Sequence, residues 1–181
     1  MKKTDLSKFD NSWYQPGLKV KVLCWYLVNM AVFKNTLPIP SSLKVRLLRG
    51  FGAIIGANVV IKPCVNIKYP WFLHIGDNCW IGEGVWIDNL AFVTIGNNVC
   101  LSQGCFLLTG SHNYKVLSFD LILGEIVLDD GVWIGAKAIV CPNVTCKSES
   151  VLAVNSVATH DLDENTIYQG NPAIAKRERA G

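Results

Sequence analysis

Charged residues are scarce in this 181-residue chain: Asp, Glu, Lys and Arg together make up 17% of it, whereas about 25% is usual for soluble domains. Half of the residues are hydrophobic, so the chain is not expected to be disordered. It also lacks the uninterrupted run of about 18 apolar residues that a membrane-spanning helix needs. The sequence therefore predicts one domain, or one domain with a small appendage, that has surplus apolar surface for subunit contacts or for a membrane.

Paired cysteines and clustered charge are lacking as well. The seven cysteines include no C-x-x-C pair, and their odd number fits neither a disulfide framework nor a zinc ribbon. The first residues are basic but are followed by acidic and aromatic residues, which is not a secretory signal. The net charge of +3 is mild and scattered, so nucleic acid is not an expected partner. We expect a protein of a reducing compartment, the cytoplasm.

A six-residue repeat dominates the chain from residue 55 onward. Aliphatic or small residues recur every sixth position, with two breaks of two residues and one longer break. The fifteen positions are Ile55, Ile61, Ile67, Ile75, Ile81, Ile87, Ile95, Leu101, Leu107, Leu128, Ile134, Val140, Cys146, Leu152 and Ala158. Glycine follows five of these positions, and residues of small or medium size stand four positions after most of them.

This pattern predicts short strands joined by tight corners. Three repeats make one turn of a triangular prism, so fifteen repeats predict about five coils that hydrogen-bond to one another. The aliphatic residue should point into the shaft, and the glycine after it should permit the corner. Cysteines at the repeat positions are then expected to be small buried residues rather than redox or catalytic groups.

The segments IGANVV, IGDNCW, IGEGVW, IGNNVC and WIGAKA make the chain resemble the hexapeptide-repeat acyltransferases. The stretch from IKYPWFLHIGDN to LLTGSHNY, the segments FDLILGEI and YQGNPA, and the N-terminal part from SKFDNSWYQPG to LLRGFGAIIGANV resemble its colanic acid biosynthesis acetyltransferase branch. The resemblance implies a mainly β fold: a left-handed parallel β-helix of about five coils with N-terminal helices and one protruding catalytic loop.

The same resemblance implies an activity. The chain would be an O-acetyltransferase that moves acetyl from acetyl-CoA to a sugar hydroxyl in bacterial exopolysaccharide biosynthesis, without a metal. It would be a homotrimer with active sites between subunits. The expected organisation is an N-terminal helical segment, residues 1–52, and a β-helix domain, residues 53–181, with an extruded loop at 108–125 and a C-terminal tail at 163–181.

The longest break in the repeat should be extruded from the prism as a loop, the kind of segment in which function concentrates. It contains TGSHNY and so holds His112, one of only three histidines. A sugar hydroxyl is a poor nucleophile while protonated, and an imidazole can take its proton near neutral pH. The family mechanism, carried onto this position, makes His112 the general base of a direct transfer within a ternary complex. His74 and His160 lie in no such motif.

Polar residues near the loop are further candidates. Glu125, at the end of the loop, is the expected catalytic partner that fixes the tautomer of His112, with Asp88 and Asn89 as alternatives. Asp88 and Asn89 stand at a corner beside a break in the repeat, where side chains can project. Together with Asn113 they are expected to contact the acceptor, as residues before the loop do in relatives. The alternative for Asp88 is a corner-capping acid.

The donor site is predicted from the segment after the loop. In relatives the aromatic residue of the GVWIGA motif lies along the acyl-CoA groove, which implies a cofactor contact for Trp133; the alternative is an indole that covers a subunit contact. The coenzyme arm and its phosphates are expected to meet further residues. These are Gly135, Ala136, Ala153, Lys176 and Arg177.

Two helices are predicted ahead of the prism. Residues 18–33 are apolar on nearly all sides, and residues 41–52 combine leucines with basic residues after a Ser-Ser cap. A helix that is apolar all round must be buried or lie in lipid. Two alternatives follow: the helices pack on the prism or on a neighbouring subunit, or residues 18–50 contact the inner face of the inner membrane peripherally, near a lipid-linked acceptor.

Other functions on the same prism remain open. One is acetyl transfer to a different small acceptor, such as serine, an antibiotic or another sugar, and another is a scaffold without catalytic activity. A zinc-dependent carbonic anhydrase would need three histidines, two of them five residues apart in one loop. The residue five positions after His112 is Leu117, which argues against that enzyme.

Overall fold

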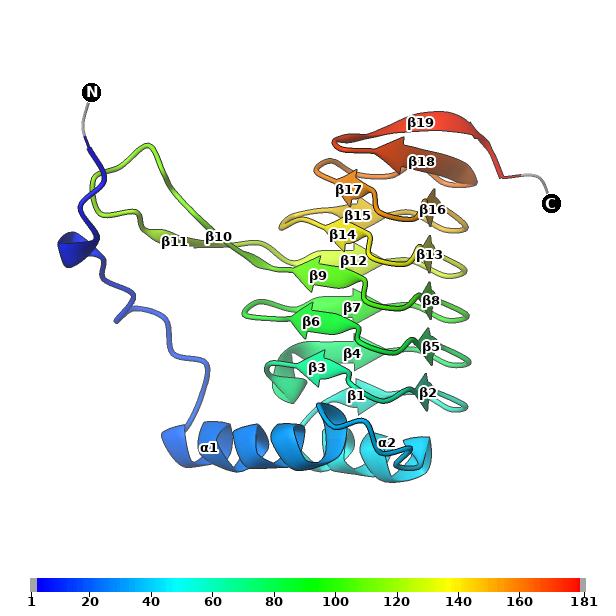
Figure 1. The fold of residues 1–181 in the computed structure, drawn as a ribbon, viewed down its shortest axis with the longest axis horizontal. Coiled ribbons are helices and arrows are strands. Elements are labelled where there is room, and N and C mark those ends of the chain that lie inside the picture. The colour runs from blue at the N-terminus through cyan, green and yellow to red at the C-terminus, as the bar shows by residue number, and fades with distance from the viewer. Residues whose placement is uncertain (1–2, 180–181) are drawn as a thin grey trace.

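The computed structural model describes residues 3–179. Short parallel strands stack into a three-sided column with two helices across one end and a β-hairpin across the other (Figure 1). A second hairpin projects from the side of the column (Figure 1). This second hairpin lies well away from the axis of the column (Figure 1).

Three sheets form the sides of the column, and the strands within each side pair in parallel up to the final hairpin. The first side contains β1 (Ile54–Ile55), β4 (Leu73–Ile75), β7 (Val93–Ile95), β12 (Ile126–Leu128) and β15 (Thr145–Cys146). The second contains β2 (Val60–Ile61), β5 (Trp80–Ile81), β8 (Cys100–Leu101), β13 (Trp133–Ile134), β16 (Val151–Leu152), β18 (Thr166–Gly170) and β19 (Ala173–Glu178). The third contains β3 (Asn66–Ile67), β6 (Trp86–Asp88), β9 (Phe106–Leu108), β14 (Ile139–Val140) and β17 (Val157–Ala158).

The number of coils follows from this stacking. The strands β1 to β9 and β12 to β17, three to a coil, make the five coils that the repeat predicts. A parallel bridge between Cys146 and Leu162, followed by β18, begins a sixth. Residues 163–181, expected as a tail, include β18 and its antiparallel partner β19, which close this end of the column.

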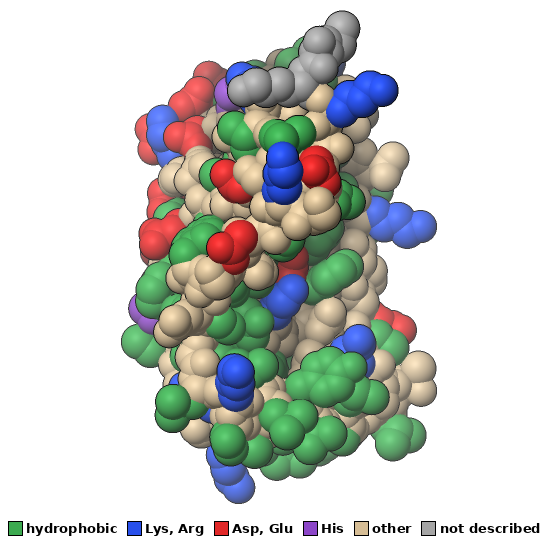
Figure 2. All heavy atoms as spheres, turned by 90° about the vertical axis from the view of Figure 1, so that its left-hand side faces the viewer, with side chains coloured by type: hydrophobic (Ala, Val, Ile, Leu, Met, Phe, Trp, Pro, Cys, Tyr) green, Lys and Arg blue, Asp and Glu red, His purple; other side chains and the backbone are tan. Residues whose placement is uncertain are grey.

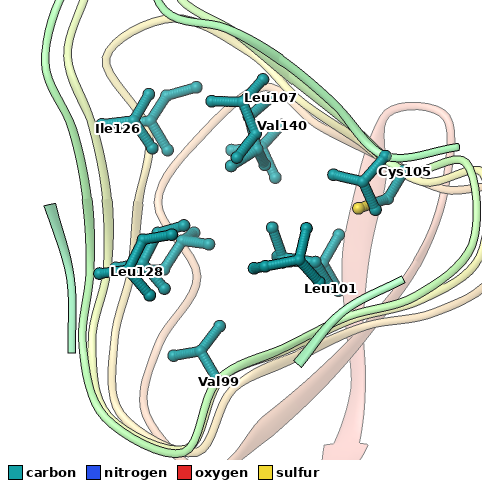
Figure 3. Packing of buried hydrophobic residues seen from close by; sticks show 14 of the residues in the cluster. Val99, Leu101, Cys105, Leu107, Ile126, Leu128 and Val140 are labelled. Carbon is teal, nitrogen blue, oxygen red and sulfur yellow. The ribbon is translucent and has the colours of Figure 1, made fainter. Parts of the chain in front are cut away.

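The shaft is filled as the repeat predicts. All fifteen repeat positions are buried, and none is more than 6% exposed. Leu101, Leu107 and Leu128 point inward from the three sides of one region of the shaft, with Val99 and Cys105 between them (Figure 3). Each coil therefore buries its apolar side chains against its neighbours, as repeat architectures do.

The glycines that follow the repeat positions permit the corners through close packing of neighbouring coils and not through a left-handed backbone. A Cβ atom on Gly76 would lie 2.7 Å from the carbonyl carbon of Gly96 in the next coil, so this glycine is needed for the close approach of two backbones. The left-handed corner conformation falls two residues later, at Asn58, Asn78 and Asn98, with φ between 56° and 57°. Asparagine tolerates this conformation better than most residues.

The N-terminal helices close the lower end of the shaft. They are α1 (Lys19–Val28), continued by a π-helical turn at Asn29–Phe33, and α2 (Ser41–Gly50). Nε1 of Trp25 donates to the carbonyl of Ile67 at 2.8 Å, and Nζ of Lys44 donates to that of Lys62 at 2.8 Å. Burial lowers the pKa of the Lys44 amine. Trp25 shares one continuous hydrophobic core with the shaft, so these helices pack on their own prism.

The segment before α1 has a role that the sequence did not indicate. It contains a 3-10 turn at Leu6–Lys8 and follows the projecting hairpin, where the N–H of Asp5 donates to the carbonyl of Leu117 at 2.9 Å. Nε1 of Trp71 anchors its other end by donating to the carbonyl of Pro16 at 2.6 Å. Among residues 3–179 no helix is long and apolar enough to cross a membrane.

Candidate active site

His112 lies on the hairpin that leaves the column after β9. The hairpin consists of β10 (Gly110–His112) and β11 (Leu121–Leu123), and His112 pairs with Leu121 across it. The two strands of the hairpin pair with each other, and the column continues undisturbed with β12 stacked directly on β7. The insertion thus moves a histidine away from the column without breaking the repeat.

Phe119 contacts the imidazole of His112 both through its carbonyl and through its ring. Its carbonyl oxygen lies 2.9 Å from Nδ1, and its ring stacks on the imidazole with centroids 4.4 Å apart and planes at 7°. Phe119 has φ 53°, a left-handed conformation that is unusual for an aromatic residue. Because a carbonyl can only accept, Nδ1 carries the hydrogen and Nε2 of the neutral ring keeps a lone pair. Nε2 is therefore the atom that can accept a proton.

The expected partners of His112 lie elsewhere. Glu125 is exposed at the end of the loop and makes no hydrogen bond or ion pair with His112 in the described part of the chain. The carbonyl of Phe119 occupies the place expected for this carboxylate. The side-chain oxygen of Asn113 accepts from the N–H of Lys115 at 3.1 Å and so stabilises a turn of the loop.

A cavity of about 500 Å³ opens beside His112. It is lined by Phe9, Asn11, Tyr14, Lys68, Tyr69 and Leu121, among others. The hydroxyl of Tyr14 donates to the carbonyl of Leu90 at 2.7 Å. Burial, and after it the charge of Asp88, raises the pKa of Tyr69, and burial likewise raises that of Tyr14. Both hydroxyls therefore stay neutral, and the cavity offers them together with aromatic faces and the charged amine of Lys68.

Asp88 and Asn89 have different positions although they are adjacent in sequence. The Oδ1 atom of Asp88 lies 3.2 Å from Nζ of Lys68, which lines the cavity. Asn89 is fully buried, accepts from the N–H of Tyr69 at 3.0 Å and donates to its carbonyl at 2.6 Å. Asn89 ties two coils together, which differs from its expected contact with the acceptor, whereas Asp88 lies next to the cavity.

A second hollow, a groove of about 470 Å³, lies on the sheet formed by β8, β13 and β16. Five of the six residues predicted for the donor line it: Trp133, Gly135, Ala136, Ala153 and Arg177. Trp133 is 47% exposed, and its Nε1 donates to Oγ of Ser102 at 2.9 Å. The sixth, Lys176, is not part of the lining, since it falls at a bulge between β18 and β19.

The cavity and the groove lie on different sides of one chain. They share no lining residue. The strands β13 and β16 form one edge of the column, and the hairpin of His112 projects from the opposite edge (Figure 1). One isolated chain therefore does not bring His112 to the groove.

Comparison with known proteins places the chain in a family. No protein-family model matches it. It is 36% identical over 176 residues to the "Putative colanic acid biosynthesis acetyltransferase WcaF" of Escherichia coli K12, with 97% of each chain covered. The chain belongs to the hexapeptide-repeat acetyltransferases. The resemblance seen in the repeat motifs and its colanic acid branch is thereby confirmed.

Solved structures agree with this membership. The hexapeptide-repeat acetyltransferase VCA0836 of Vibrio cholerae superposes with a TM-score of 0.81 at 24% identity, with 90% of this chain and 93% of that one covered. Galactoside acetyltransferase, solved in complex with coenzyme A, gives a TM-score of 0.78 at 25% identity, with 89% and 82% covered. The predicted left-handed β-helix is confirmed, and so is an acetyl-CoA-dependent acetyltransferase of the hexapeptide-repeat type.

Several residues of the acetyltransferase site were not predicted to take part in it. Phe119 lies in the FDLILGEI segment, and Phe9 and Tyr14 lie in SKFDNSWYQPG, but the resemblance of these segments gave the three residues no role. Phe9 reaches His112 from more than a hundred residues away, with ring centroids 5.6 Å apart. Ser102 bonds Trp133 because their strands are neighbours in one sheet. Among the described residues no group of three or more His, Cys, Asp or Glu side chains could hold a metal ion.

The stacked ring of Phe119 leads to a first prediction. Phe119→Gly keeps the left-handed backbone and its carbonyl but removes the ring, so the imidazole becomes free to tilt. We expect kcat for acetyl transfer to fall roughly tenfold, because small misplacements of a catalytic group are costly. The KM for acetyl-CoA should stay constant, and Phe119→Tyr should restore kcat. Steady-state release of free thiol measures both values, and an unchanged kcat in Phe119→Gly would show that the ring does not position His112.

Proposed function

We propose that this acetyltransferase moves acetyl from acetyl-CoA to a hydroxyl of a sugar that is built into a bacterial exopolysaccharide. The observation that carries the proposal is the geometry of His112, whose Nδ1 is bound to a carbonyl while its Nε2 is left as a base beside a cavity lined by polar and aromatic side chains. The name of the relative WcaF, which refers to colanic acid biosynthesis, supports this acceptor class.

The proposed reaction is a direct transfer. Nε2 of His112 takes the proton of the acceptor hydroxyl while the hydroxyl oxygen bonds to the thioester carbon. The tetrahedral intermediate collapses with cleavage of the carbon–sulfur bond, and the leaving thiolate receives the proton from the imidazolium. No bond to the protein forms. The Lys68–Asp88 ion pair and the hydroxyl of Tyr69 are positioned to orient the acceptor at the cavity wall.

The proposal includes a homotrimer. Because the groove and His112 lie on opposite edges of one chain, a complete site requires the hairpin of one subunit to reach the groove of the next (Figure 1). Three copies around an axis close such a head-to-tail contact into a ring. The trimer would also cover part of the surplus apolar surface.

We further propose that the acetyltransferase works in the cytoplasm. All seven cysteines are free in the structure, although several are exposed or only partly buried. Free thiols of this kind persist in a reducing compartment.

Analysis of the surface glycan tests the proposed acceptor. Mass spectrometry of the exopolysaccharide from cells with and without this protein should show the loss of one acetyl group at a defined sugar, and the purified protein should release thiol from acetyl-CoA when that sugar is added. Unchanged glycan acetylation would refute the exopolysaccharide acceptor. If the purified protein instead releases thiol with serine or an antibiotic, the acceptor class is different.

A further inference from the structure

Acidic residues are absent from one end of the molecule. Between Asn11 and Gly76 the chain contains no Asp or Glu but eight basic residues. These residues include α1, α2 and the first coil, which form the lower end of the column in Figure 1. Figure 2 shows this lower end covered by hydrophobic and basic side chains, with no acidic side chain among them. We call the outer surface of α1, α2 and their connection, residues 18–50, the base.

An apolar face of α1 is uncovered on the base. Trp25 faces the prism, and the side chains on the opposite face of α1 and of its π-helical continuation are Val20, Leu23, Leu27 and Met30, each at least 50% exposed. Leu37 and Leu43, outside α1, are exposed as well. A contiguous apolar patch of this kind, rimmed by charge, is typical of an interaction surface.

Basic groups at the base are free to bind an anion. The side chains of Lys19, Lys34 and Arg46 are exposed and make no hydrogen bond or ion pair within residues 3–179. Arg46 and Arg49 also line a hollow of about 550 Å³ at the edge of the base, together with Ser42. The guanidinium of Arg49 already donates to the carbonyls of Ile55 and Gly56, so Arg46 is the guanidinium of the hollow that is free to bind a phosphate.

Other copies of this chain do not account for the patch. The exposed face of α1 points along the column axis, away from the prism, whereas neighbours in a trimer lie beside the column. If the outer surfaces of residues 18–50 of two chains faced each other, basic groups would lie against basic groups. Neither chain has an acidic residue between Asn11 and Gly76 to compensate for this repulsion. Charge complementarity therefore favours an anionic surface as the occupant.

We propose that the base docks on the surface of an anionic lipid bilayer. The apolar face of α1 enters the boundary between headgroups and acyl chains, and the free basic side chains contact lipid phosphates. The column then stands away from the bilayer, with the hairpin of His112 and the groove at its sides. If the proposed function holds, this arrangement lets the acetyltransferase reach an acceptor carried on a membrane lipid.

Vesicle flotation with the full-length protein tests the docking. Vesicles of phosphatidylcholine alone are compared with vesicles that also contain phosphatidylglycerol. We expect flotation with the anionic vesicles and little with the neutral ones. In the double variants Leu23→Gln/Leu27→Gln and Lys34→Glu/Arg46→Glu the bound fraction should fall about tenfold, because docking depends on both apolar burial and charge. The matched control is Ile174→Gln, an exposed apolar residue on β19 at the far end, which should float as the unchanged protein does.

Three results would overturn the docking proposal. They are equal binding to neutral and anionic vesicles, no binding to either, and unchanged binding of the leucine variant. Binding to native membranes but not to protein-free vesicles made from their lipids would identify a protein partner instead. Melting temperatures confirm that the variants fold, and thiol release with a soluble acceptor is measured in parallel. If the unchanged protein released no thiol with a soluble acceptor, this result would count against the proposed function and not against the docking.

Discussion

Replacement of His112 by alanine is expected to lower kcat for acetyl transfer between about 10²- and 10⁴-fold, the range that a positioned general base contributes. Nε2 is the atom left with a lone pair once Nδ1 is bound to the carbonyl of Phe119, so the substitution removes the proton acceptor. The KM for acetyl-CoA should change little, because the imidazole acts on the acceptor hydroxyl and the residues that line the groove stay unchanged.

The expected fall in kcat should not be caused by unfolding of the His112→Ala variant. His112 lies on a projecting hairpin and contributes no side chain to the shaft, so His112→Ala should melt near the temperature of the unchanged protein. His160→Ala is a suitable control, since His160 is exposed in the last coil and, among residues 3–179, bonds only to Thr159. Acetyl transfer that persists at the wild-type rate in His112→Ala would exclude this histidine as the base.

Mixing two inactive variants is expected to restore activity. One variant is His112→Ala, and the other is Ala136→Trp, which places a large side chain in the groove. If each site combines the hairpin of one subunit with the groove of the next, every mixed trimer holds one intact site of three. Trimers that contain both variants should therefore show about a third of wild-type kcat.

The measurement uses co-expression with two different affinity tags, so that sequential purification retains only mixed assemblies. Each variant purified alone serves as the inactive control. Mixed assemblies that are as inactive as the single variants would mean that His112 and the groove must come from one chain. This outcome would contradict a site shared between subunits, but it would not contradict the role of His112 as the general base.

Five of the residues that line the donor groove could be predicted from the sequence. Trp133 was predicted from a motif, and Gly135 and Ala153 were predicted as contacts of the coenzyme arm. All three line one groove because parallel strands in adjacent coils stack in register. A repeat converts separation along the chain into adjacency in space, so positions in neighbouring coils can be paired from sequence alone. The position of Lys176 could not be predicted in this way, because Lys176 lies at a bulge beyond the last coil, and it does not line the groove.

The surroundings of His112 could not be paired in this way. A loop extruded from the repeat has no register, and its contacts depend on where its hairpin turns. Phe119 supplies both a carbonyl and a ring to the imidazole because its backbone is left-handed, which its residue type does not suggest. Glu125 was expected beside Nδ1 of His112 because it is close in sequence, but the carbonyl of Phe119 lies there instead.

The column, its inward side chains, the extruded loop and its histidine could all be predicted from the six-residue period, because each corner and each inward side chain depends on residues close to it along the chain. The surroundings of that histidine and the exposed surface of the base became evident only in the folded chain. The cavity joins Phe9 to His112, and the free face of α1 is defined only once Trp25 is buried against the prism. Both depend on packing between segments far apart in the chain, and no local pattern encodes that packing.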